Sequence, residues 1–83
     1  MARFFFNVHD GSDRPDREGT ELPDLAAARH AAVRFAAELL RDHPDEFWNG
    51  EDWSMDVADA DGLLFFTLMF SAFDAPSVRA TPR

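Results

Sequence analysis

The N-terminal stretch from Arg3 to His9 alternates between apolar and mixed positions, and an Asp-Gly pair follows it. A short run of aromatic and β-branched residues that ends in a turn signal predicts a strand. Alternation places Phe4, Phe6 and Val8 on one wholly apolar face, so we expect that face to line the core. The next segment, Asp10 to Pro23, combines charge and turn formers without periodicity. It predicts a loop that either wraps a sheet edge or carries function.

Residues 24–43 repeat apolar side chains at helical spacing, which predicts an amphipathic helix. Asp24 can cap the free amides at its start, and Pro44 stops it at the other end. Its many alanines keep the apolar stripe flat, which suits close packing on a sheet. In the polar segment that follows, we expect Phe47 and Trp48 to fold back over one end of the core.

Two further strands are predicted in the second half of the chain. Trp53 to Ala58 alternates cleanly, and Asp59 to Gly62 has the composition of a hairpin turn. Leu63 to Ala72 is apolar on both faces, which is typical of a central strand. The prediction is an α+β fold, a β-α-β-β domain over residues 1–73 followed by a flexible tail over residues 74–83.

With the last strand central, the three-stranded sheet takes the order 1-3-2, a split β-α-β unit with a right-handed crossover and one helix packed on one face. The other face is then uncovered, and we expect on it a mixed patch of a few hundred Å², on the order of known interaction surfaces. The candidate binding residues are Phe5, Asn7, His9, Asp10, Phe65 and Met69. The thin core and this patch favour a homodimer, formed face to face or by edge pairing of the first or second strand.

Composition, charge and the length of the apolar runs exclude several classes of function. The chain has 16 acidic residues and eight basic ones, for a net charge of −8, which argues against a nucleic-acid partner. The longest apolar run is far too short to cross a membrane, and no signal peptide is visible, so we expect a cytoplasmic protein. The absence of cysteine excludes disulfides and thiol chemistry. The 46% of hydrophobic residues predicts a folded chain despite the charge.

Candidate chemistry lies in the acidic segment and at the end of the first strand. The twelve residues from Asp10 to Glu21 have the length of a calcium loop, but Arg14 and Pro15 stand where that motif needs an oxygen ligand and a glycine. A solvated acidic loop is therefore expected. The metal candidates within it are Asp10, Asp13, Asp16 and Glu18. His9, near Asn7 on the same face, forms the clearest small polar site, but no nucleophile is spaced to it, so no catalytic residue and no cofactor are predicted.

The first third of the chain carries three short motifs, which are Arg3-Phe4-Phe5-Phe6, Val8-His9-Asp10-Gly11 and Glu18-Gly19-Thr20-Glu21-Leu22-Pro23-Asp24 before an alanine-rich helix. With these motifs the chain resembles a family of small proteins common in alpha-proteobacteria, which is catalogued as a domain of unknown function. The resemblance extends to about Ala72. Two positions depart from it, because the family often has Tyr in place of Phe4 and His in place of Asn7. The resemblance implies a fold and no activity.

Three functions are carried forward as hypotheses. The leading one is a small acidic interaction or regulatory module, homodimeric and non-catalytic. An alternative is an antitoxin-like or acidic mimic module that binds a basic protein partner, because the order of strand, acidic loop and alanine-rich helix is similar to part of the HicB-type antitoxin fold and the net charge would attract such a partner. A second alternative is a metal-binding protein that uses the acidic loop with His9 and Asp10.

Overall fold

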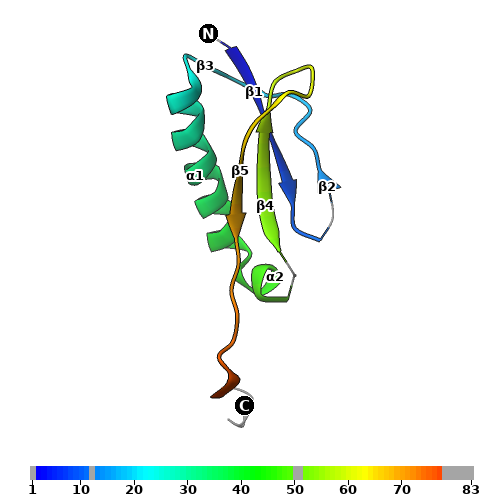
Figure 1. Cartoon of the computed structure of the whole chain (residues 1–83), viewed down its shortest axis with the longest axis vertical. Coiled ribbons are helices and arrows are strands. Elements are labelled where there is room, and N and C mark those ends of the chain that lie inside the picture. Colours follow the sequence, from blue (N-terminus) through cyan, green and yellow to red (C-terminus); the bar gives the residue numbers. More distant parts are fainter. Residues whose placement is uncertain (1, 12, 50–51, 78–83) are drawn as a thin grey trace.

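The protein is a twisted antiparallel sheet with one long helix packed on one of its faces (Figure 1). A computed structural model describes residues 2–11, 13–49 and 52–77. Its elements in chain order are β1 (Ala2–His9), β2 (Asp13–Arg14), β3 (Thr20–Leu22), α1 (Leu25–Asp42), α2 (Pro44–Asn49), β4 (Trp53–Ala58) and β5 (Leu64–Phe70). None of the helices in this part of the chain is long and apolar enough to span a membrane.

The strand order is β2-β1-β4-β5, and β3 also pairs with β1. β4 lies between β1 and β5 and is antiparallel to both, with Asp56 opposite Asn7 on one side and Thr67 on the other. The predicted three-stranded sheet with the order 1-3-2 is therefore wrong, since the sheet has five strands and its last strand is at the edge. The predicted split β-α-β unit is wrong as well, because β1 and β4 are antiparallel neighbours and no parallel crossover connects them.

Residues 10–23, predicted as a loop, wrap one edge of the sheet through two very short strands. β2 pairs with the end of β1, with Arg14 opposite Val8. β3 pairs with the start of β1, with Thr20 opposite Phe4. Of the two alternatives given for this segment, the structure shows the one in which it wraps a sheet edge. Its two strands were not predicted, because two or three residues are too few to carry a periodic signal.

Helix α1 agrees with its prediction to within one residue at either end. The carboxylate of Asp24 accepts a hydrogen bond from the amide of Ala27 at 2.8 Å, which caps the first turn. Its buried side chains are small, namely Ala28, Ala31, Ala32 and Ala36. Because alanine extends little beyond the backbone, the helix can lie close to the sheet, and the sheet supplies most of the core volume.

The core lies between α1 and the helix-facing side of the sheet. Its buried sheet residues are Phe4, Phe6, Val8, Trp53, Met55 and Val57. The predicted core face of the first strand is thus confirmed. The ring of Phe6 meets that of Phe35 on α1 edge to face, with centroids 5.1 Å apart.

The short helix α2 was not predicted, although the expected return of its aromatic residues toward the core is half right. Phe47 packs against the core, whereas Trp48 remains 58% exposed. Pro44 does end α1, and it then opens α2, where a missing amide hydrogen and a fixed φ are tolerated.

β5 deviates from regular pairing at its first residues. The register between β4 and β5 shifts between Val57 and Ala58, and the ring of Phe65 lies 5.5 Å from that of Phe4. Phe4 belongs to the helix-facing side, so Phe65 does not join the open face on which simple alternation places it. An irregularity in strand pairing can turn a side chain from one face of the sheet to the other, as it does for Phe65.

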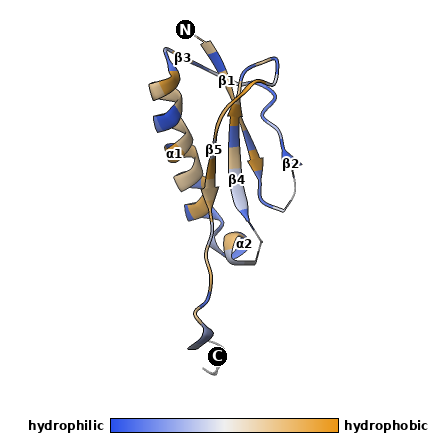
Figure 2. Ribbon diagram, viewed as in Figure 1, coloured by the Kyte–Doolittle hydropathy of each residue, from blue (hydrophilic) through white to orange (hydrophobic). Residues whose placement is uncertain are grey.

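The chain leaves the sheet after β5 and runs on past α2, away from the body of the domain (Figure 1). Residues 71–77 are exposed. The predicted tail began at residue 74, and residues 78–83 of it lie outside the described part. Figure 2 shows that the hydrophobic colouring of β5 extends along the whole strand up to this exit.

Candidate functional site

A chain of polar contacts crosses the open face of the sheet and is centred on His9. Its Nδ1 lies 2.7 Å from a carboxylate oxygen of Asp13, and its Nε2 lies 3.1 Å from one of Asp56. The other carboxylate oxygen of Asp56 accepts a hydrogen bond from the hydroxyl of Thr67 at 2.8 Å. The contacts connect β1 with β2, β4 and β5, so they hold together the strands of the open face.

The two carboxylates favour the charged form of His9. The hydrogen bond to Asp13 is the largest influence and raises the pKa of His9 above its ordinary value of 6.5. Burial opposes this rise, and the hydrogen bond and negative charge of Asp56 reinforce it. The hydroxyl of Thr67 is bonded to the carboxylate of Asp56 and not to the imidazole, so His9 is not placed to take the proton of that hydroxyl.

The gap between β2 and β3 on the outer edge of β1 is filled by Asp16. Its carboxylate accepts a hydrogen bond from the backbone amide of Phe6 at 3.1 Å, in the position a neighbouring strand would occupy. It also accepts hydrogen bonds from the amides of Glu18 and Gly19. The side chain of Asn7 completes the link by accepting a hydrogen bond from the amide of Asp16 at 2.8 Å.

These bonds determine the charge state of Asp16. Burial is the largest single influence and acts to raise its pKa, but the hydrogen bonds from Gly19, Phe6 and Glu18 and the positive charge of Arg3 together outweigh it. The pKa of Asp16 is therefore lowered from its ordinary value of 3.8. The carboxylate is committed to the backbone, which makes it part of the fold and not a ligand group.

Gly19 allows this edge to close. Its φ of +75° is a conformation that other residues rarely adopt. A Cβ atom at this position would lie 2.8 Å from Cγ of Arg3 and 2.9 Å from Cε2 of Phe5. The segment thus lies directly on Phe5, so that part of the predicted open patch is covered by the chain itself.

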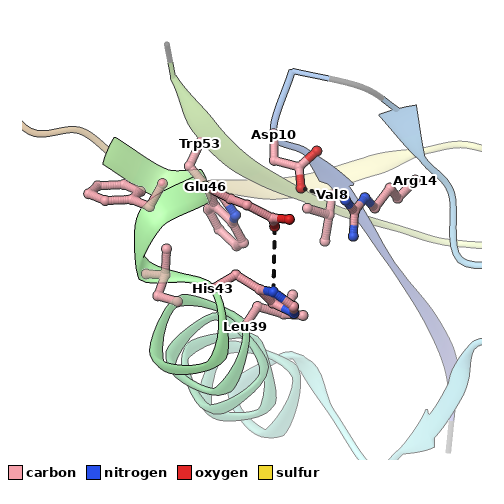
Figure 3. Close-up of a pocket in the computed structure, with 9 residues that line it drawn as sticks. Val8, Asp10, Arg14, Leu39, His43, Glu46 and Trp53 are labelled. Carbon is pink, nitrogen blue, oxygen red and sulfur yellow. Dashed lines mark ion pairs between the residues drawn. The ribbon is translucent and has the colours of Figure 1, made fainter. Parts of the chain in front are cut away.

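A small cavity of about 130 Å³ lies where the end of α1, α2 and the end of β1 meet. Figure 3 shows its apolar wall with two ion pairs at its rim, Asp10 with Arg14 at 3.4 Å and His43 with Glu46 at 3.5 Å. It is smaller than the roughly 300–1,000 Å³ of drug-sized ligand pockets. Asp10 thus lies on the helix side of the sheet, away from His9 on the open face.

The structure separates the predicted binding residues into several places. Only Asn7, His9 and Met69 remain on the open face, and Met69 lies opposite Ser54 there. The metal candidates also have separate roles, since Asp13 contacts His9 while Asp16 binds backbone amides. Within the described residues, no group of three or more histidine or acidic side chains lies close enough to hold a metal ion.

The surface that the sequence reading missed is the outer edge of β5. This strand reads Leu-Phe-Phe-Thr-Leu-Met-Phe and has no charged residue over its seven positions. Large apolar side chains are exposed along it and at both of its ends, at Leu63, Leu64, Phe65, Met69 and Phe73. A strand that is apolar on both faces can be a central strand, or an edge strand that a partner covers. The apolar composition of both faces of β5 was therefore the signal in the sequence that could have indicated this edge.

The fold and its surfaces define a small antiparallel α+β domain whose polar contacts organise the sheet and whose apolar surface gathers at one edge. Residues 3–71 match the family described as Domain of unknown function (DUF6894). Since this match covers most of the chain, the protein belongs to that family, and the predicted resemblance to a domain of unknown function is confirmed. Comparisons with curated proteins and with solved structures gave no match.

Proposed function

We propose that the protein is a non-catalytic interaction module that acts as a homodimer, in which a second copy of the chain pairs along the outer edge of β5. The observation that carries the proposal is this seven-residue uncharged strand at the edge of the sheet of a protein with a net charge of −8. In the described chain no strand pairs with that edge. Its backbone donors and acceptors are therefore available to another strand.

Charge favours a second copy at this edge over other places on the surface. Two copies that each carry a net charge of −8 repel one another wherever acidic side chains meet. The acidic residues are concentrated in the loop before β3, around α2 and in the turn before β5, where Asp59 and Asp61 lie. β5 itself brings uncharged backbone and apolar side chains to the contact, so the repulsion is smallest there.

The other arrangements considered for a homodimer have less support. The outer edge of β1 is already paired with β2 and β3, and β4 is central, so neither the first nor the second predicted strand offers an edge. A contact between two open faces would bring Asp13 and Asp56 of each copy toward those of the other. Such a contact would oppose like charges.

The experiment is a mass measurement by light scattering over a concentration series, with two matched variants. Wild-type protein is expected at about 19 kDa, twice the chain mass of 9.4 kDa. Met69→Glu introduces a charge at the β5 edge and is expected to yield a monomer, since edge charges block strand pairing. Val33→Glu places the same charge on an exposed apolar position of α1 and is expected to remain a dimer. A wild-type monomer at every concentration, or a dimeric Met69→Glu, would overturn the proposal.

A further inference from the structure

The imidazole of His9 lies between two carboxylates that come from different strands. Its Nδ1 is 2.7 Å from Asp13 on β2, and its Nε2 is 3.1 Å from Asp56 on β4. We propose that His9 is a pH-dependent latch for β2. With a proton on both ring nitrogens it holds β2 against the sheet, and with a single proton it keeps its bond to Asp56 and releases β2. These contacts lie within one chain, so the latch does not depend on the homodimer proposed above.

The geometry determines how many protons the two contacts need. An ionised carboxylate only accepts hydrogen bonds, and each ring nitrogen of His9 faces one. Imidazolium donates from both nitrogens, whereas neutral imidazole has one N–H and one lone pair. Loss of a proton therefore sets a lone pair against a carboxylate at one of the two contacts. Among the described residues that pair with His9 on β4 or bond to Asp56 from β5, Ser54 and Thr67 are uncharged and do not alter this balance.

The two carboxylates differ in how firmly they are held. Asp56 lies in β4, which is paired on both sides, and its other oxygen accepts the hydrogen bond from Thr67 at 2.8 Å. Asp13 lies in a strand of two residues at the end of the sheet, and its side chain is 83% exposed. Water can replace His9 at Asp13, so the contact with β2 is the one that is given up. The remaining proton is then on Nε2, bonded to Asp56.

The released segment is short, because the chain is tied down again directly after β2. The carboxylate of Asp16 accepts the hydrogen bond from the amide of Phe6 at 3.1 Å, and the amide of Asp16 donates to Asn7 at 2.8 Å. The pKa of Asp16 is lowered from its ordinary value of 3.8, so these bonds persist in the range where His9 titrates. The change is therefore confined to β2 and its immediate neighbours, and β3 stays paired with β1.

Release of β2 has a consequence for the cavity at the end of α1. Arg14 belongs to β2 and pairs with Asp10 at 3.4 Å on the rim of this cavity (Figure 3). When β2 leaves the sheet, Arg14 leaves the rim, and the wall that includes Trp53 becomes more accessible. In a protein carrying Trp48→Phe, quenching of Trp53 fluorescence by acrylamide should therefore increase as the pH rises through the titration of His9. Quenching that stays constant would overturn the opening of the cavity.

The latch is tested by NMR of the whole chain between pH 5 and pH 9. Nitrogen-15 shifts of the imidazole show which nitrogen of neutral His9 carries the proton, and we expect Nε2. Nuclear Overhauser contacts of residues 8–9 with residues 13–14 should weaken over the same titration, as the ratio of paired to unpaired β2 falls by up to about fivefold, the limit for an exposed ion pair. Contacts between Asn7 and Asp56 should remain. A proton on Nδ1, loss of the Asn7–Asp56 contacts instead, or constant contacts between β1 and β2 would each overturn the proposal.

Asp13→Asn distinguishes the latch from a general effect of pH. An amide side chain can donate to the lone pair of neutral imidazole and can also accept from imidazolium. The contacts of β2 should thus become independent of pH, and the pKa of His9 should fall relative to wild type. His43→Gln is the matched control, because His43 also pairs with a carboxylate, that of Glu46 at 3.5 Å, but lies outside the latch. A pH dependence of β2 that survives in Asp13→Asn, or that disappears in His43→Gln, would refute the latch.

Discussion

Replacing Asp16 with alanine removes the side chain that bridges the gap between β2 and β3. Three backbone amides, those of Phe6, Glu18 and Gly19, lose their acceptor together. The exposed amide of Glu18 can bind water instead. The hydrogen bonds from the amides of Phe6 and Gly19 are partly buried, so water replaces their lost partner less well.

The expected cost follows from these contacts. A hydrogen bond to a charged group contributes roughly 1.5–3 kcal/mol, and a buried donor left without a partner costs roughly 1–3 kcal/mol. Counting mainly the partly buried amides of Phe6 and Gly19, with a smaller share for the exposed amide of Glu18, we expect Asp16→Ala to lower the free energy of unfolding by about 2–4 kcal/mol. A domain with roughly 5–15 kcal/mol of stability will register such a loss clearly.

The charge of Asp16 gives the loss a pH dependence. Because the pKa of Asp16 is lower in the folded chain than its ordinary value of 3.8, its stabilising effect is fully present above that pH and is lost as the pH falls through the folded pKa. We therefore expect the difference between wild type and Asp16→Asn in urea unfolding to be largest at pH 7 and to shrink toward pH 2.

A control separates the role of Asp16 from that of acidic side chains in general. Asp13→Ala removes a mostly exposed carboxylate from the same segment, and its cost should stay below about 1 kcal/mol. An Asp16→Ala protein within about 0.5 kcal/mol of wild type, the range of an ordinary surface substitution, would refute the reasoning. So would a difference between wild type and Asp16→Asn that does not change between pH 7 and pH 2.

Three further substitutions test other contacts by denaturant unfolding. Because the pKa of His9 is raised in the folded chain, wild type should have an added stability of less than about 1 kcal/mol below pH 6.5 and lose it as the pH rises through that raised pKa. His9→Gln should abolish this pH dependence, and an unchanged pH profile would contradict the assignment. Gly19→Ala should cost at least about 1 kcal/mol more than Gly62→Ala, because both have positive φ but only the former meets Arg3 and Phe5; equal costs would exclude crowding. Asp24→Ala should cost about 1 kcal/mol through loss of the helix cap, and no change would show that water replaces it.

The elements that could be predicted are those whose signal is local. α1 has a capping carboxylate at its start and apolar residues at helical spacing, and β4 alternates over its first five residues. The place of β5 could not be read in the same way, because an apolar strand has the same composition whether its own chain or another covers it. β2 and β3 are strands because they pair with the edge of β1. A segment of two or three residues does not show such a pairing in its own sequence.

Among the polar contacts, too, those between residues close in sequence could be predicted and those between distant residues could not. His9 could be recognised from the sequence as a polar residue at a strand end, and Asp13, its first contact, is only four residues farther along the chain. Asp56, the second contact, is 47 residues away and is brought there by the pairing of β1 with β4. Asp56 is the single charged residue inside β4, and this was the signal that could have identified it. Asp16 was proposed as a metal candidate, and its role as a substitute strand partner required knowledge of the gap it fills.

The pairing of β1 with β4 also has a kinetic consequence. β1 closes on β2 and β3 within a short stretch of chain, and β4 closes on β5 across a tight turn, so both of these units can form early. The ladder between β1 and β4 joins residues about fifty positions apart, so its formation closes a much longer loop. We expect the two halves to assemble as separate cooperative units, with the amides of the β1–β4 ladder exchanging with solvent only when the whole domain opens.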